Sequence, residues 1–73
     1  MLNNDFYLKL GLNIKKYRNK LSISQQELAD RVNLSLNFIG KIEVAFSKPS
    51  LETLIKIAEA LEITVSELFD FNN

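Results

Sequence analysis

The sequence predicts an all-α fold, a compact bundle of five helices in one domain that spans residues 1–73. Apolar residues recur at three- or four-residue spacing along most of the chain, which is the period of a half-buried helix. Serine or threonine stands directly before four of these stretches, where a helix N-cap is expected. One proline and two glycines leave few helix breakers, and the 47% hydrophobic composition is that of a globular protein.

The first predicted helix covers about residues 5–20. Its apolar positions form one stripe that can face a core, and they are Phe6, Leu10, Ile14, Tyr17 and Leu21.

Two short helices follow with a tight turn between them. Ser24 and Glu27 have the spacing of a capping box, so the second helix is expected to begin at Ser24. It should end near Asn33, because asparagine tolerates the left-handed turn that closes a helix. Ser35 then caps a third helix that runs through about Val44. The expected inward residues of the pair are Leu28, Ala29, Val32, Ile39 and Ile42.

A loop over residues 45–49 leads to the last two predicted helices. Ser50 caps a helix over Leu51–Leu61, and a second capping box at Thr64–Glu67 opens a short terminal helix. The expected inward residues are Leu54, Ile57, Ala58 and Leu61, then Leu68, Phe69 and Phe71.

The residue types point away from an enzyme and from a bound metal or cofactor. There is no cysteine and no histidine, so disulfides, thiolate zinc sites and the usual general base are absent. No glycine-rich phosphate loop or nucleophile–base pair is present. There is no secretory signal and no 18-residue apolar stretch, so we expect a cytoplasmic location away from membranes. No small-molecule effector site is evident in the sequence.

Charge is unevenly distributed although the formal net charge is zero. Residues 1–48 carry a net charge of +4, and residues 49–73 carry −4. Such polarity can steer a polyanion to one side of a molecule, although charges that simply solvate helix faces would give the same count.

Two short helices joined by a tight turn have the geometry that places a second helix in the major groove of DNA. At residues 24–44 the chain also resembles the Cro/cI-type (XRE) helix-turn-helix regulators, whose DNA-binding domains are lambda repressor-like. The similarity extends over residues 10–69, and it rests on Gly11, Ile14, Arg18, Ser24–Ala29, Asn33–Ser35, Ile39, Ile42–Glu43, Pro49–Leu54, Ile57–Leu61 and Glu67–Phe69.

The resemblance implies a regulator that binds double-stranded DNA and occupies a palindromic operator as a homodimer. Short members of the family include phage repressors, restriction–modification controllers and antitoxins. Positions expected to contact bases are Ser35, Leu36, Asn37 and Lys41. Positions expected to contact phosphates are Gln25, Lys15, Lys16 and Lys48. Arg18 and Glu43 match an internal ion pair of related repressors, so we interpret them as structural.

Some positions depart from the family pattern. Ala45 stands where the family usually has glycine, so we expect this loop to take another path, because alanine resists the left-handed conformation. Leu36, Phe38 and Phe46 are apolar where polar or basic residues are common. Leu36 can contact a thymine methyl group, and Phe38 can pack against the domain or a partner. The three residues can equally weaken or abolish DNA binding.

The resemblance to short controllers places dimerisation in the last two helices, and we expect a dimerisation region over residues 62–73. Its candidate residues are Ile63, Val65, Leu68, Phe69 and Phe71, which could instead all close the monomer core. Phe6 and Tyr7 form a second candidate patch.

An alternative function is a protein-interaction module that keeps the fold and lacks DNA affinity. It is favoured by a recognition helix with one cation, Lys41. Replacing Lys41 and Lys48 by alanine separates the two functions, since only DNA binding should weaken.

Overall fold

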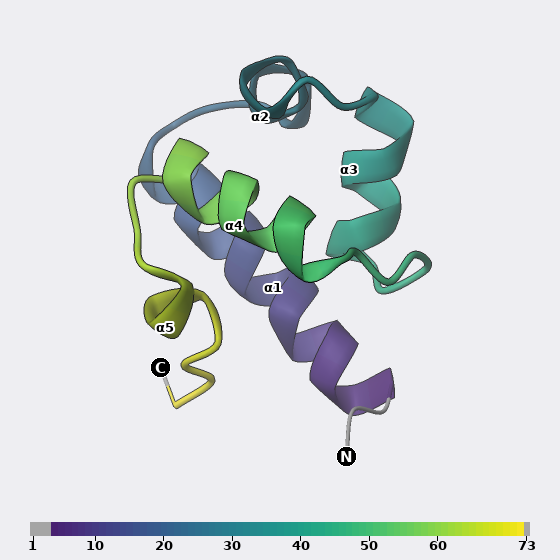
Figure 1. Ribbon diagram of the computed structural model, residues 1–73, viewed down its shortest axis with the longest axis vertical. Helices are drawn as coiled ribbons and strands as arrows, with labels where there is room; N and C mark the ends of the chain where they lie inside the picture. Colours follow the sequence, from purple (N-terminus) through teal and green to yellow (C-terminus); the bar gives the residue numbers. More distant parts are fainter. Residues whose placement is uncertain (1–3, 73) are drawn as a thin grey trace.

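The computed structural model describes residues 4–72, and its regular structure over that range consists of five α-helices (Figure 1). They are α1 (Asn4–Lys20), α2 (Gln25–Val32), α3 (Leu36–Glu43), α4 (Leu51–Ala60) and α5 (Val65–Leu68). In Figure 1, α1 crosses behind α4, α2 and α3 lie at the top and right, and α5 lies at the left. The predicted fold class and helix order are confirmed. Residues 1–3 and 73 of the predicted domain lie outside the described residues.

Hydroxyl side chains begin four of the helices, as predicted. Ser24, Ser35, Ser50 and Thr64 each accept a hydrogen bond from the backbone N–H three residues later. The capping box at Thr64 is complete, because the Glu67 carboxylate also accepts from the Thr64 N–H at 2.9 Å. At Ser24 only the serine half forms, and the Glu27 carboxylate accepts from Arg31 Nη2 at 3.4 Å.

The first four helices end in the same left-handed turn, and none of these ends uses glycine. The residues with positive φ are Ser22 (57°), Asn33 (58°), Ala45 (64°) and Glu62 (63°). In each case the N–H of the following residue bonds to a carbonyl five residues back, which closes a Schellman motif. Asn33 confirms the prediction made for it.

The expectation that the loop at Ala45 takes another path is wrong. Its N–H bonds to the carbonyl of Ile42 at 3.1 Å, and the Phe46 N–H bonds to the carbonyl of Lys41 at 2.8 Å. The Ser47 N–H bonds to the Lys41 carbonyl as well, at 3.2 Å. These bonds pair carbonyls at the end of α3, which offsets the unfavourable φ of alanine.

All five helices contribute side chains to one core. Its members are Leu10, Ile14, Ile23, Leu28, Ala29, Val32, Ile39, Ile42, Leu54, Ile57, Ala58, Leu61 and Leu68. Phe6, Tyr17 and Leu21 of the predicted α1 stripe are only partly buried at its edge. Leu68, which the sequence assigned to a dimer face, is 0% exposed and therefore belongs to this core.

Gly11 lets α1 and α3 approach each other backbone to backbone. A Cβ added at Gly11 would overlap the carbonyl oxygen of Glu43 and would lie 2.7 Å from that of Ile42. The absence of a side chain at this position therefore sets where the C-terminal end of α3 rests on α1.

The segment after α5 is fastened to α1 by polar and aromatic contacts. Asn13, which is buried, donates through Nδ2 to the carbonyls of Leu68 and Asp70, both at 2.9 Å. The Phe6 ring lies 5.8 Å from the Phe69 ring and 5.4 Å from the Phe71 ring, measured between centroids. Much of the apolar surface of Phe69 and Phe71 is therefore in contact with other parts of the same chain.

Between residues 4 and 72, no helix combines the length and apolar character needed to cross a bilayer.

Candidate nucleic-acid interface

Helix α3 presents two parallel rows of side chains on the face that points away from the core. Ile39, Ile42 and Glu43 are buried on the inner face. On the outer face, Asn37 and Lys41 form a polar row, one helical turn apart. Beside it, an apolar row with the same four-residue spacing consists of Leu36, Gly40 and Val44, where Val44 is the C-cap residue.

Ser35 stands at the start of this helix as the N-cap. Its hydroxyl accepts from the Phe38 N–H at 3.0 Å. This bond uses an acceptor lone pair and leaves the hydroxyl proton available for donation. Ser35, Leu36, Asn37 and Lys41, the predicted base-contacting residues, thus lie together on α3 or at its N-terminus.

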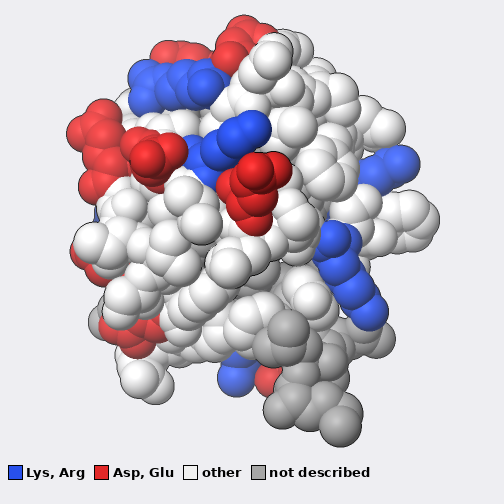
Figure 2. Space-filling view, viewed as in Figure 1, with Lys and Arg blue, Asp and Glu red and all other residues white. Residues whose placement is uncertain are grey.

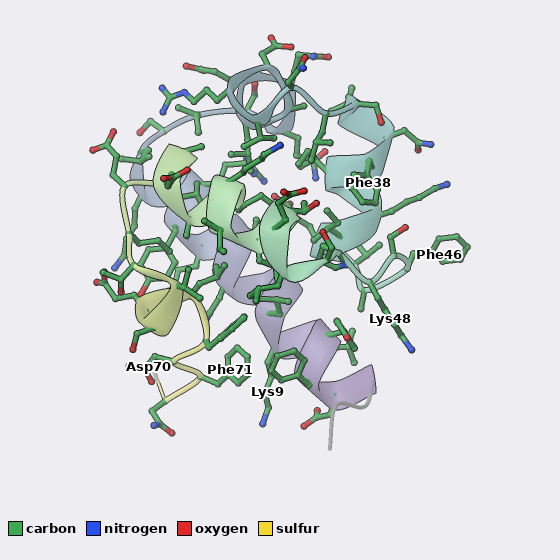
Figure 3. All side chains as sticks on the ribbon, viewed as in Figure 1. Lys9, Phe38, Phe46, Lys48, Asp70 and Phe71 are labelled. Carbon is green, nitrogen blue, oxygen red and sulfur yellow. The ribbon has the colours of Figure 1, made fainter. Side chains whose placement is uncertain are left out.

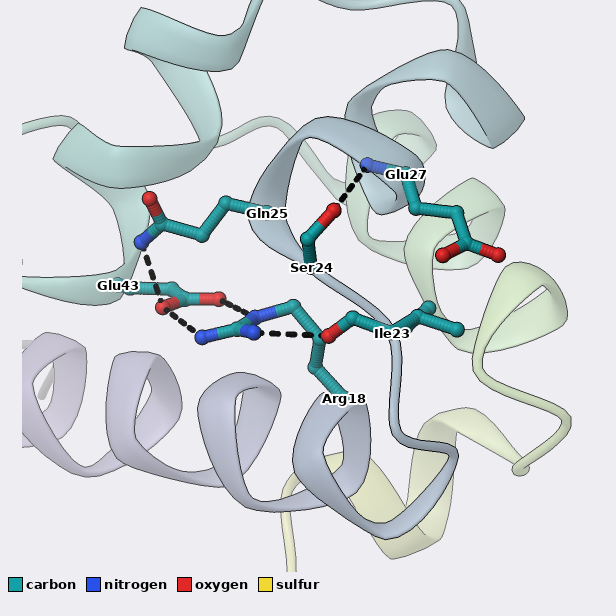
Figure 4. Close-up of polar contacts among 6 residues, drawn as sticks. All are labelled: Arg18, Ile23, Ser24, Gln25, Glu27 and Glu43. Carbon is teal, nitrogen blue, oxygen red and sulfur yellow. Dashed lines mark hydrogen bonds and ion pairs between the residues drawn. The ribbon is translucent and has the colours of Figure 1, made fainter.

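The predicted ion pair between Arg18 and Glu43 is present and buried (Figure 4). Arg18 donates through Nε to Glu43 Oε2 at 2.7 Å and through Nη2 to Glu43 Oε1 at 3.2 Å. Its Nη1 donates to the carbonyl of Ile23 at 2.9 Å, just before α2 begins. One guanidinium thus joins α1, the start of α2 and the end of α3, which fixes the helix-turn-helix on its support.

Gln25, at the start of α2, belongs to the same network. Its Nε2 donates to Glu43 Oε1 at 2.9 Å (Figure 4). Because a carboxylate only accepts, this contact fixes the amide with nitrogen toward Glu43 and oxygen toward Gly40. Nε2 keeps a second hydrogen, which can reach a phosphate oxygen beside the free N–H groups of the helix terminus.

Two of the four candidate cations, Lys41 and Lys48, each lie near an aromatic ring. Lys41 places Nζ 5.6 Å from the centroid of the Phe46 ring. Lys48 places Nζ 5.4 Å from the centroid of the Tyr7 ring. Figure 3 shows Phe46 and Lys48 pointing away from the domain on the side of α3.

The two lysines of α1 differ in position. Lys15 is exposed and lies four residues after Gly11 and three before Arg18, on the stripe of α1 that faces α3. Lys16 lies about 150° around the helix from that stripe, since each residue turns by about 100°. Its Nζ lies 4.7 Å from the centroid of the Tyr17 ring. The structure thus brings Lys15 to the α3 side and leaves Lys16 away from it.

The side of the molecule that α3 occupies has basic side chains and no acidic ones in the view of Figure 2. Carboxylates lie at the left, top, centre and bottom of that view with basic side chains among them, whereas only basic side chains project from the right edge, where α3 lies in Figure 1. The outer face of α3 itself carries no carboxylate among residues 36–44, because the glutamate at position 43 is buried in the ion pair. This face can therefore approach a polyanion with little repulsion.

Three residues of this surface received no groove-facing role from the sequence, namely Gly40, Val44 and Phe46. The spacing of Leu36, Gly40 and Val44 was a usable signal, but glycine carries no apolar side chain and breaks the pattern. Phe46 follows the left-handed turn at Ala45 and is 78% exposed.

The comparison with known proteins identifies the class. A profile of the family described as Helix-turn-helix matches residues 14–68, and the chain belongs to this family. The control protein C.MunI from Mycoplasma sp is 37% identical over 67 residues, which is 90% of each chain. The phage CTXphi transcriptional repressor RstR from Vibrio cholerae is 34% identical over 61 residues, which is 84% of this chain and 54% of RstR. The chain thus spans about half the length of RstR.

Solved structures agree with this assignment. The restriction-modification controller protein C.AhdI from Aeromonas hydrophila superposes with a TM-score of 0.84 at 32% identity, covering 86% of this chain and 96% of C.AhdI. SinR, described as the master regulator for biofilm formation and solved in complex with DNA, superposes with a TM-score of 0.78 at 31% identity, covering 84% of this chain and 98% of the SinR chain in that structure.

Proposed function

We propose that this protein is a sequence-specific DNA-binding transcription regulator that lays α3 in the major groove. The observation that carries the proposal is the outer face of α3, where Asn37 and Lys41 stand one turn apart on a helix held from behind by the buried Arg18–Glu43 pair. Its relatives RstR and C.MunI are named as a repressor and a control protein, and SinR was solved with DNA.

The polar row supplies groups that read base edges. The Asn37 amide can pair with N6 and N7 of adenine, and the Lys41 ammonium can donate to O6 and N7 of guanine. Gln25, Lys15 and Lys48 would hold phosphates and set the register of α3 without reading sequence.

We further propose that the chain acts as a homodimer on a palindromic operator. One module of this size buries only about 600–1,000 Å² on DNA, so a second copy is needed for tight specific binding. Half-sites would then lie about 34–36 Å apart, one turn of the duplex.

The surface that best fits a second copy runs along α4. Leu51 and Ile55 are exposed on one face of this helix, one turn apart. Leu51 also borders a groove of about 450 Å³, which is lined by Phe6, Tyr7, Pro49, Leu51, Leu54 and Phe69. Of the dimer residues assigned from sequence, Phe69 lines this groove and Leu68 lies beneath the surface, while Ile63, Val65 and Phe71 are partly buried around the same core.

A protein-interaction module is the second candidate function. It is favoured by the large apolar side chains of Leu36, Val44 and Phe46, which are exposed on or beside the recognition helix. Under this function the same surface binds another protein and has no affinity for duplex DNA.

The decisive experiment is selection from a random-sequence duplex pool, followed by affinity measurements against salt. We expect enrichment of a palindrome with half-sites about 10 bp apart, and a loss of affinity of about 10³–10⁵ between 50 and 200 mM salt if 6–10 phosphates are contacted. Lys41→Ala should weaken operator binding while the protein stays folded. Lys56→Ala, on exposed α4 in the acidic half, is the matched control and should bind normally. Failure to bind DNA even at low salt would contradict the proposal.

The dimer is tested separately by sedimentation equilibrium. Leu51→Glu and Ile55→Glu should shift the protein toward monomer, because each places a charge in an apolar contact. Leu12→Glu changes an equally exposed leucine on α1 and should leave the dimer intact. A monomeric wild-type protein on DNA would refute this part of the proposal.

A further inference from the structure

We infer that the apolar row of α3 reads thymine, with the hollow at Gly40 receiving the C5-methyl group in the major groove. This inference rests on the proposed DNA-binding function and adds the base class that the recognition surface selects.

The hollow is a physical feature of the outer face of α3. It is an open depression with a volume of about 340 Å³, and it is lined by Gln25, Leu36, Asn37, Gly40, Lys41, Val44 and Phe46. At its floor, a Cβ added to Gly40 would find its nearest neighbour, Gln25 Oε1, 3.9 Å away, so no other part of the domain fills the space. Leu36 and Val44 stand at either end of the row, about 12 Å apart along the helix axis.

Three of the side chains that line this hollow are apolar and open to solvent. Leu36 is 44% exposed, Val44 is 67% exposed and Phe46 is 78% exposed. Removing apolar side chains of this kind from water lowers the free energy of the complex. A single methyl group matches the gap that the missing side chain of Gly40 leaves. The polar side chains of Gln25, Asn37 and Lys41 line the rest of the hollow, so the methyl contact is assigned to Leu36, Val44 and Phe46.

Among the four bases, thymine alone presents a methyl group in the major groove. Cytosine carries hydrogen at the same ring position, so the hollow discriminates between the two pyrimidines. Asn37 lies beside the apolar row and suits adenine, the partner of thymine. The two rows together therefore favour A·T pairs in the centre of each half-site. Lys41, farther along the helix, would contact a guanine.

The experiment replaces thymine by deoxyuridine, one position at a time, in the operator obtained by selection. This change removes the methyl group and keeps base pairing. Affinity is measured by fluorescence anisotropy with the intact protein. We expect about fourfold weaker binding at one thymine in a half-site, and about tenfold or more when both half-sites are changed.

Protein variants assign the effect to the hollow. In Leu36→Ala and Val44→Ala the penalty for deoxyuridine should fall below twofold, because the methyl group has lost its contacts. Leu12→Ala alters an exposed leucine on α1 and should keep the full penalty. Circular dichroism checks that each variant is folded.

Each outcome bears on the inference. Specific binding without any deoxyuridine penalty would overturn the inference and leave the proposed function standing. A penalty that persists unchanged in Leu36→Ala and Val44→Ala would show that another surface reads the methyl group. If intact duplex is not bound at all, and the hollow instead binds a protein, both the proposed function and the inference fail.

Discussion

Replacing Ala45 by glycine should stabilise the protein, because the turn after α3 forces alanine to a φ of 64°. A left-handed conformation costs an L-residue about 1–2 kcal/mol relative to its favoured conformations. Glycine avoids that cost. However, glycine has more conformations to lose on folding, which destabilises the folded state by about 0.4–1 kcal/mol. The expected net gain is therefore about 1 kcal/mol, which corresponds to a melting temperature about 4–8 °C higher for a domain of this size.

Thermal and urea unfolding followed by circular dichroism measure this change. Ala60→Gly is the matched control, because Ala60 is the last residue of α4 and has no positive φ. Glycine there should lower stability by about 0.5–1 kcal/mol. Operator affinity should be unchanged in Ala45→Gly, since the two hydrogen bonds of the turn are kept. If Ala45→Gly is no more stable than the wild type while the control behaves as expected, the account of the turn is wrong.

Three further predictions concern glycine, the ion pair and the C-terminal segment. Gly11→Ala should cost about 1–3 kcal/mol of stability, because its methyl group meets the α3 backbone. Gly40→Ala should be neutral or slightly stabilising, and it should weaken operator binding because its methyl group fills the hollow. Urea unfolding compares the stability of the two variants and anisotropy their operator affinity, and equal losses of stability would contradict the close approach at Gly11. Arg18→Ala should cost about 3–5 kcal/mol by leaving Glu43 buried without its partner, and a melting temperature close to that of the wild type would refute a buried pair. Asn13→Ala removes two hydrogen bonds to the end of the chain and should cost about 1–3 kcal/mol, with faster amide exchange in α5; unchanged exchange there would contradict this role.

Much of the fold could be predicted because its signals are local. A hydroxyl side chain three residues before a free N–H can cap a helix wherever the chain places it, and Ser24, Ser35, Ser50 and Thr64 all do so. Asn33 could be predicted for the same reason, since its own side chain makes the left-handed turn tolerable.

The remaining helix ends could not be predicted from residue type. Ser22, Ala45 and Glu62 adopt positive φ although none is a preferred residue there. Ile23 lies in the core immediately after the first of these turns, and Ile63 packs against the core after the last. Burial of the following residue therefore favours the turns at Ser22 and Glu62, and such tertiary effects leave no local trace in the sequence. It does not account for the turn at Ala45, because Phe46, which follows, is 78% exposed.

The candidate site shows the same division. The Arg18–Glu43 pair was identified because the resemblance supplied it, and its contacts to Gln25 and to the Ile23 carbonyl appear only in three dimensions. The sequence placed Leu68 both among the inward residues and among the dimer candidates, since an apolar residue near a terminus suits a core and a dimer face equally well, and its burial assigns it to the core.

The separation of charge on this molecule has a consequence for how it would search a genome. Non-specific affinity for DNA grows with the number of cations that reach the backbone, and a chromosome offers about 10⁶–10⁹ competing sites. With zero net charge and basic side chains alone projecting on the α3 side in Figure 2, this chain would, under the proposed function, gain torque toward that face but little long-range attraction. Non-specific chromosomal DNA would thus bind only a small share of the protein molecules. The occupancy of the operator would then follow the concentration of the protein in the cell closely.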